Sequence, residues 1–272
     1  MFTFRALASG SSGNAYLLRT GKVALLFEAG VRLPLLRAYL ATENVALEDL
    51  TAVFISHEHR DHCLAARDLA VAYRAAIHAH PEVLRAAGLH ECSHATPLEL
   101  GVPVLLGDVQ ITSFPVPHDS VRQVGFLIEL GARTICIATD LGQSTSHVHD
   151  AVRAANLVVL EANHDVEMLQ TGRYPAYLRK RVAGPTGHLS NTQAATILAE
   201  HVRESGTEVW LAHLSKENNT PQLAVRTVQR ILKSSAAAGA SVQAIRRDRP
   251  SLRWTGQLKP RQLSLFTDFG GL

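Results

Sequence analysis

Three histidines and one aspartate lie close together in the segment His57-Glu58-His59-Arg60-Asp61-His62. The apolar run 51–56 before this segment predicts a short buried β-strand, and residues 64–73 predict a helix after it. Side chains two positions apart at the end of a strand project to the same side, so His57 and His59 can converge on one ion. Asp61 and His62 fall where the helix begins and can face a second ion. Nitrogen and oxygen ligands without thiolate favour zinc, manganese or iron over a structural cysteine–zinc site.

This spacing of histidine and aspartate is rare. The chain has 14 histidines in 272 residues, and a His-x-His-x-Asp-His pattern is expected by chance in roughly one such chain in a thousand. The alternative is a polar surface turn with incidental histidines. The strand–turn–helix context favours the metal site because it is the setting that the chemistry requires.

Length and composition indicate a globular protein with a large core. Hydrophobic residues make up 46% of the chain and charged residues 19%, and the net charge of +3 permits a nucleic-acid partner without requiring one. The three widely spaced cysteines, Cys63, Cys92 and Cys136, imply no disulfide framework, so a reducing cytoplasm is expected. Neither a secretory signal peptide nor an apolar run of membrane-spanning length is apparent.

The remaining pattern alternates strands with helices. Expected strands are 2–8, 15–19, 22–27, 51–56, 76–80, 103–106, 109–116, 125–130, 134–139, 157–161 and 208–212. Expected helices are 33–42, 64–73 and 145–155, with further helices beginning at Pro81, Ser190 and Pro221. Two strand-rich halves, each closed by helices, predict an α/β fold with a four-layered αβ/βα sandwich. We expect one catalytic domain over 1–255 and a tail over 256–272.

Three further polar residues lie just beyond apolar strands. His118, Asp140 and His213 each follow a predicted strand, at the position where sheets place their sites. Singly, each is more typical of a capping or turn residue, but together they suggest further ligands.

The motif and these later residues resemble the metallo-β-lactamase superfamily. The resemblance implies that His57, His59 and His118 hold one divalent ion, zinc or manganese. It implies that Asp61, His62 and His213 hold a second and that Asp140 bridges them. Asp61 is also expected to act in catalysis. Such a site keeps a net positive charge, which favours an anionic substrate such as a phosphodiester.

Other segments are similar to the YycJ/WalJ-type nuclease branch, from Ser9 to about Ser251. They include Glu161-Ala-Asn-His164, Gly187-His188-Leu-Ser190 and His213-Leu-Ser215. Glu161 and His188 are similar in placement to a glutamate–histidine pair of tRNase Z enzymes, in which the histidine protonates the leaving oxygen. An imidazole held by a carboxylate suits that task at neutral pH. His188 also precedes a capping box, Ser190-x-x-Gln193, so it can equally be a residue of the helix start.

Several candidate substrate contacts remain open. The segment Ser9–Asn14, with Ser11 and Asn14, can be a phosphate-binding nest or an ordinary hairpin loop. His164 can contact substrate or support a ligand, and Arg60 can clamp a phosphate or lie in solvent. The basic runs Arg179-Lys180-Arg181 and 246–253 can hold backbone phosphates, although each run alone usually forms a solvated face. His78 and His80 repeat the spacing without the following Asp-x-His and are expected to be part of a strand face.

One position departs from the family pattern. The second hairpin strand usually ends Asp-Ala-Gly, and that aspartate supports a metal-binding histidine. Here the residues are Glu28-Ala29-Gly30. Because glutamate is one methylene longer, the groups around the ligand must rearrange, which can alter metal affinity.

The sequence therefore predicts a dinuclear metal-dependent phosphodiesterase, a 5′-to-3′ DNA exonuclease of mismatch-repair type. RNA processing of the tRNase Z type, thioester or lactam hydrolysis at the same metals, and a DNA-associated scaffold are the alternatives. The final segment contains Gln262-Leu263-Ser264-Leu265-Phe266, which resembles the peptide that docks bacterial repair proteins on the sliding clamp of DNA polymerase. Gln262, Leu263, Leu265 and Phe266 would make the clamp contacts, and the alternative is a final edge strand that packs on the domain.

Overall fold

The strands form two sheets of seven in the computed structural model, which describes residues 1–203 and 206–257. In spatial order, the first sheet consists of β14 (Arg253–Trp254), β1 (Thr3–Ala8), β2 (Ala15–Arg19), β3 (Ala24–Phe27), β4 (Ala52–Phe54), β5 (Ala76–Ala79) and β6 (Ala95–Pro97). The second consists of β13 (Ser241–Ala244), β12 (Glu208–Ala212), β11 (Leu157–Glu161), β10 (Arg133–Ala138), β9 (Val124–Leu130), β8 (Val109–Pro115) and β7 (Val104–Leu106).

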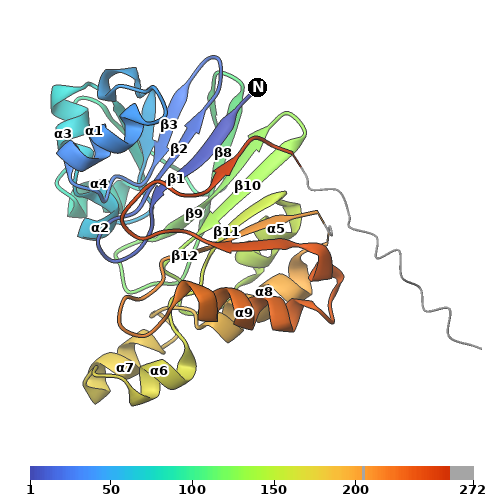
Figure 1. Cartoon of the computed structure of the whole chain (residues 1–272). Helices are drawn as coiled ribbons and strands as arrows, with labels where there is room; N and C mark the ends of the chain where they lie inside the picture. Colours follow the sequence, from blue (N-terminus) through green and yellow to red (C-terminus); the bar gives the residue numbers. More distant parts are fainter. Residues whose placement is uncertain (204–205, 258–272) are drawn as a thin grey trace, which may run out of the picture.

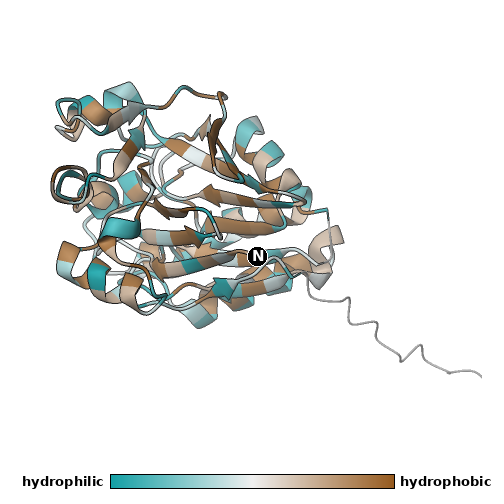
Figure 2. Cartoon of the chain, turned by 90° about the horizontal axis from the view of Figure 1, so that it is seen from above, coloured by the Kyte–Doolittle hydropathy of each residue, from teal (hydrophilic) through white to brown (hydrophobic). Residues whose placement is uncertain are grey.

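The two sheets pack face to face through aromatic side chains. Phe27 of β3 meets Phe126 of β9 edge-on, with ring centroids 5.5 Å apart, and Phe4 of β1 stacks on Trp210 of β12 at 5.6 Å. All four are buried. Apolar stretches of the strands therefore fill the interior (Figure 2). Burial of such large rings is the main stabilising contribution to this layer.

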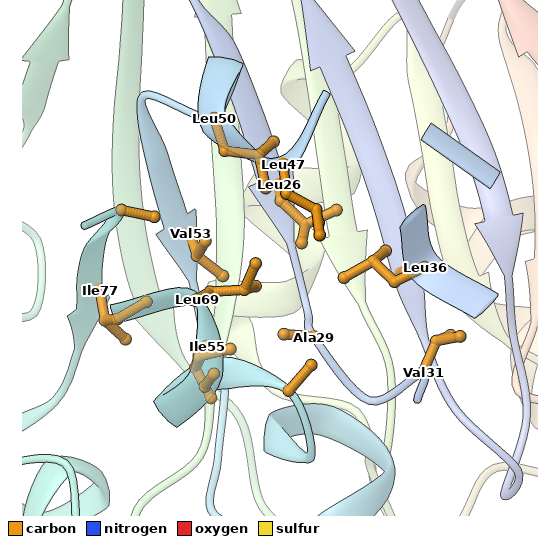
Figure 3. Packing of buried hydrophobic residues seen from close by; sticks show 14 of the residues in the cluster. Leu26, Ala29, Val31, Leu36, Leu47, Leu50, Val53, Ile55, Leu69 and Ile77 are labelled. Carbon is orange, nitrogen blue, oxygen red and sulfur yellow. The ribbon is translucent and has the colours of Figure 1, made fainter. Parts of the chain in front are cut away.

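Helices cover the outer face of each sheet (Figure 1). Over the first sheet lie α1 (Leu33–Ala41), α3 (Ala66–Ala72) and α4 (Pro81–Ala86), with the short α2 (Arg60–Cys63) beside them. Leu36 of α1 and Leu69 of α3 pack into the same cluster as Leu26 and Val53 of the sheet (Figure 3). Over the second sheet lie α5 (Ser146–Ala154), α8 (Asn191–His201) and α9 (Pro221–Leu232). The predicted four-layered αβ/βα sandwich is confirmed.

Some elements differ from the sequence prediction. The helix expected over 64–73 is the shorter α3, and a separate short helix, α2, precedes it and begins inside the histidine motif. Two helices, α6 (Val166–Thr171) and α7 (Ala176–Val182), were not predicted and project from the body (Figure 1). Each buries a single residue, Leu169 or Val182, so neither has an apolar periodicity to detect. The strands β6, β13 and β14 and the 3₁₀ turn Ala236–Gly239 were also missed because they are two to four residues long.

The topology brings the carboxyl ends of the central strands to one edge. β3 and β4 are parallel in the first sheet, and β10, β11 and β12 are parallel in the second. β8 runs in the direction of β10, because both are antiparallel to β9. Within the described ranges, no helix combines the length and the apolar character that a membrane span would require.

Candidate metal centre

All seven predicted ligands lie together at this edge. His57, His59, Asp61 and His62 follow β4, whereas His118, Asp140 and His213 follow β8, β10 and β12. They form overlapping groups in which the nitrogen and oxygen atoms that can bind a metal lie within 4.8 Å of one another. Residues far apart in sequence thus meet because their strands end at the same edge.

The first group contains three imidazoles. The ring centroid of His57 is 4.6 Å from that of His59, and both rings are 5.2 Å from His118. Nδ1 of His57 lies 2.9 Å from Ser56 Oγ, and Nδ1 of His118 lies 3.2 Å from the carbonyl oxygen of Gly187. These contacts occupy Nδ1 of both rings, and Nε2 of His118 also lies 3.2 Å from Asp119 Oδ1. Nε2 of His57 is buried and has no hydrogen-bond partner among the described residues.

Burial lowers the pKa of His57 well below its ordinary value, and it also lowers the pKa of His118. Both rings are therefore neutral at pH 7 and offer a lone pair. A buried, unpartnered ring nitrogen of His57 next to the neutral ring of His118 fits a divalent metal ion.

The second group is rich in carboxylates. His213 Nε2 lies 3.3 Å and His62 Nε2 3.7 Å from the same Asp61 oxygen, Oδ2. Burial opposes protonation of both histidines. The nearby carboxylates outweigh it: they raise the pKa of His62 well above its ordinary value and that of His213 to about 10. This end of the site therefore favours positive charge, which a divalent ion can supply in place of the protons.

Asp140 lies between the two groups. Its Oδ2 is 3.0 Å from His62 Nε2, its Oδ1 is 3.2 Å from His213 Nδ1, and it also groups with His57. Burial favours its neutral form, but His213 and His62 hold the pKa of Asp140 well below the ordinary value. Both Asp140 and His213 adopt left-handed backbone, with φ of 56° and 52°. Such conformations are uncommon outside glycine and cluster at functional sites.

Buried polar groups support the ligands from behind. Glu28 Oε2 lies 3.3 Å from His62 Nδ1 and accepts a hydrogen bond from the Ser56 backbone N–H. The longer glutamate thus reaches the ligand histidine from a left-handed backbone with φ of 64°. Gly30 is required here, because a Cβ on it would lie 1.6 Å from the backbone oxygen of Asp61.

Glu161 and His188 form a pair beside the ligands. Glu161 Oε1 lies 2.8 Å from His188 Nδ1 and 3.1 Å from His213 Nδ1, and Oε2 accepts a hydrogen bond from the Leu141 backbone N–H. Burial opposes protonation of His188, but the Glu161 carboxylate outweighs it and raises the pKa of His188. Its side chain is 22% exposed, whereas Glu161 is fully buried. The carboxylate therefore holds Nδ1 of an imidazole that can reach solvent.

The remaining predicted residues have different surroundings. Ser11 and Arg60 are exposed near the site. Asn14 is buried, with Nδ2 3.0 Å from His62 Nε2, so its contacts are to a ligand rather than to solvent. His164 is also buried, which lowers its pKa to about 4. His78 stacks on Phe54 and His80 begins α4, so neither joins a metal-binding group, in agreement with the prediction.

The basic run in α7 lies next to the site. Arg181 Nε contacts Asp119 Oδ2 at 2.6 Å, and Asp119 Oδ1 is 3.2 Å from His118 Nε2. Arg179 donates to the Gln170 carbonyl, and Lys180 is exposed.

Sequence reasoning missed several supporting residues. Asp119 contacts a ligand directly, Gln123 donates to the backbone oxygen of Asp140 at 2.8 Å, and Asn163 donates to that of His213 at 2.9 Å. Only the position of Asp119 and Asn163 beside motif residues could have drawn attention to them. Residues 258–272, with Gln262, Leu263, Leu265 and Phe266, lie outside the described part of the chain.

Known proteins share both the sequence pattern and the fold. The family model for the beta-lactamase superfamily domain matches residues 25–213. Exodeoxyribonuclease WalJ of Streptococcus pneumoniae is 35% identical over 233 residues, covering 84% of this chain and 87% of the relative. Exodeoxyribonuclease YycJ of Bacillus anthracis is 30% identical over 234 residues, covering 85% and 89%.

Solved structures agree on the fold. YhfI of Bacillus subtilis, a metallo-beta-lactamase fold protein, has a TM-score of 0.69 at 19% identity, covering 93% of this chain and 98% of its own. The short form of human tRNase Z has a TM-score of 0.63 at 19% identity, covering 94% and 99%. Since the matches span most of the chain, it belongs to the metallo-β-lactamase superfamily of metal-dependent hydrolases, in the branch that includes WalJ and YycJ.

Proposed function

We propose that this chain is a dinuclear metal-dependent phosphodiesterase that degrades DNA from the 5′ end. The observation that carries the proposal is the Glu161–His188 pair, which lies against the ligands Asp140 and His213 with His188 open to solvent. The names of the 30–35% identical relatives support deoxyribonuclease activity. A lactam or thioester hydrolase would not need a proton donor held in this way.

The donor atoms divide into two sets. His57, His59 and His118 would hold one ion, Asp61, His62 and His213 the other, and Asp140 would bridge them. Zinc or manganese suits this mixture of imidazole and carboxylate. When bound, two such ions would polarise the phosphoryl oxygens and provide an activated water nucleophile.

The residues of the chain then complete the reaction. Attack of water on phosphorus breaks the bond to the 3′-oxygen, which needs a proton as it leaves. Nδ1 of His188 is held by Glu161, so Nε2 can deliver that proton. The raised pKa of His188 keeps the imidazolium form available near neutral pH, and the Leu141 backbone N–H helps to keep the Glu161 oxygens in place.

End-labelled substrates test this function. Duplex and single-stranded DNA and RNA, labelled at the 5′ or 3′ end, are digested with zinc and manganese supplied separately. The proposal expects mononucleotide release from the 5′ end of DNA. Preferred cleavage of RNA would indicate processing of the tRNase Z type, and hydrolysis of a chromogenic lactam without nuclease activity would overturn the proposal.

We also propose that the terminal segment tethers the enzyme to the DNA polymerase sliding clamp in the cytoplasm, in the service of mismatch repair. The support is the sequence Gln262-Leu-Ser-Leu-Phe266 alone. Leu265 and Phe266 would anchor in a hydrophobic pocket, and tethering would raise the local concentration on DNA. Titration of the purified clamp with the wild type and with Leu265→Ala/Phe266→Ala decides the matter. Equal binding by both chains, or none by either, would exclude tethering by this segment.

A further inference from the structure

A pocket of about 320 Å³ opens between the segments that follow β1, β12 and β13. Its lining includes Ser9, Lys216, Arg246, Arg247 and Asp248. The pocket belongs to the same edge of the sheets as the metal centre, because β1, β12 and β13 all end there. Its volume is in the range of small-molecule sites.

The pocket shares a wall with the metal centre. Ser9 Oγ accepts a hydrogen bond from the backbone N–H of His213 at 2.9 Å, and Leu214, the next residue, lines the pocket. A ligand in the pocket is therefore separated from a proposed metal ligand by one layer of residues. Successive phosphates follow one another directly along a DNA strand, so the phosphate next to the scissile one would lie on the side of this neighbouring pocket.

The side chains of the pocket carry an excess of two positive charges. Lys216, Arg246 and Arg247 contribute three cations against the single carboxylate of Asp248. Lys216 and Arg246 are exposed, and within residues 1–203 and 206–257 neither has a salt-bridge partner. Cations without partners beside an anionic reaction site attract the phosphates of the substrate.

Arg247 is held in position for such contacts. Its Nη2 donates to the carbonyl oxygen of Leu214 at 3.0 Å, and its stem packs on Gly10. A Cβ on Gly10 would lie 3.0 Å from Arg247 Cγ and 3.3 Å from Nε, so glycine makes room for the arginine. The first turn of the twelve-residue helix α9 also lines the pocket and adds partial positive charge.

We infer that this pocket binds the phosphate next to the scissile one on the DNA strand. The inference rests on the proposed function and extends it by naming a second phosphate subsite. The basic stretch 246–253 therefore has two parts with different surroundings. Arg246 and Arg247 line the pocket together with Lys216 from another loop. Arg253 belongs to β14 and approaches Thr3 instead.

The test removes charge either from the cations of the pocket or from the DNA phosphate that they are proposed to bind. Lys216→Ala/Arg246→Ala removes two pocket cations, and Lys22→Ala/Arg230→Ala removes two exposed cations elsewhere. Oligonucleotides lack the charge on one of the two phosphates that flank the scissile one: either the 5′-terminal phosphate is omitted, or the linkage on the 3′ side is an uncharged methylphosphonate. For the wild type, one of these changes should lower kcat/KM by about 10- to 100-fold, the size expected for charged hydrogen bonds.

On unmodified DNA, the pocket variant should show the same 10- to 100-fold loss of kcat/KM. Neutralising the flanking phosphate should then lower its kcat/KM by less than about twofold further, because the protein variant and the modified DNA remove the same interaction. The control variant should behave as the wild type. Bis(p-nitrophenyl) phosphate has a single phosphate, so its hydrolysis should be equal in all three proteins. If loss of the flanking charge slows the pocket variant as much as the wild type, or if neither flanking phosphate matters to the wild type, the subsite is excluded.

A binding measurement separates this inference from the proposed function. Fluorescence anisotropy of a labelled oligonucleotide with chelator present requires no catalysis. The pocket variant should bind more weakly than the control variant, and the slope of log affinity against log salt should fall by about one. Equal binding by the two variants would overturn the subsite even if DNA is cleaved. Absence of DNA cleavage by the wild type would overturn the proposed function alone.

Discussion

The two groups of candidate metal ligands differ in charge although they lie side by side. His57, His59 and His118 bring three imidazoles, and burial lowers the pKa of two of them. Asp61, His62 and His213 lie among the carboxylates of Asp140, Glu28 and Glu161, which raise the pKa of both histidines. His57 and His118 thus present neutral nitrogen donors, whereas the carboxylates of the other group favour the protonated forms of His62 and His213.

Because of this difference, two ions bound at the proposed site would not be equivalent. Imidazole suits zinc, whereas carboxylate oxygens suit manganese and magnesium. We therefore expect the three-histidine group to prefer zinc and the carboxylate-rich group to discriminate less. Because both groups include Asp140 among their neighbours, a substitution of Asp140 should affect metal binding by both of them.

Removing the shared carboxylate should have the largest effect. Asp140→Asn keeps a residue that tolerates left-handed backbone but removes the charge between the ions. We expect loss of detectable phosphodiesterase activity, on the order of 10³-fold or more, with reduced metal content by elemental analysis. Asp150→Asn on the exposed face of α5 is the control. Normal turnover with both metals retained would show that Asp140 does not bridge.

His188 lies between the groups, with its ring 5.2 Å from His118 and 5.4 Å from His213. His188→Ala should lower turnover of DNA by about 10²- to 10⁴-fold with little loss of metal. An ester with a p-nitrophenolate leaving group needs no proton and should be far less affected. The exposed His147→Ala serves as the control. Equal losses on both substrates would remove His188 from the role of acid.

Glu28→Gln tests the carboxylate-rich group alone. It keeps the shape of a side chain 3.3 Å from His62 Nδ1 but removes its charge. Metal affinity of this group should fall by about 10- to 100-fold, as for other residues that orient ligands, while the three-histidine group should be unchanged. Competition with a chromophoric chelator measures both affinities, and Glu48→Gln, exposed in a 3₁₀ turn, is the control. Equal weakening of the two groups would contradict their independence.

The number of protons released on metal binding should differ between the two groups, and this is the smallest of the expected effects. His59→Ala leaves the carboxylate-rich group to bind metal, and Asp61→Ala leaves the three-histidine group. At pH 7 the raised pKa values keep His62 and His213 protonated, so binding there should release about two protons and strengthen as pH rises. Burial keeps His57 and His118 neutral, so binding there should release almost none. Calorimetry in buffers of different ionisation enthalpy counts the protons, and equal release from the two variants would refute the contrast.

Much of the site could be predicted from local sequence. The histidine motif lies within six residues, and the strand before it and the helix after it follow from apolar periodicity. His118, Asp140 and His213 could be anticipated because each follows an apolar strand, and parallel strands end at one edge of a sheet. The fold class followed from the same alternation of strands and helices.

Only the tertiary structure decided which groups stand behind the ligands. Asn14 contacts His62 across 48 positions, and Ser9 meets the backbone of His213 across 204. No periodicity encodes such contacts, because they depend on how the two sheets pack and on where the loops beyond their edges turn. For the same reason, Lys216 and Arg246 could not be assigned to one pocket before the segments after β12 and β13 were seen to share a wall. The sequence predicted the candidate ligands because four of them lie within six residues and each of the other three follows an apolar strand. Long-range packing determined the charge that surrounds each of them.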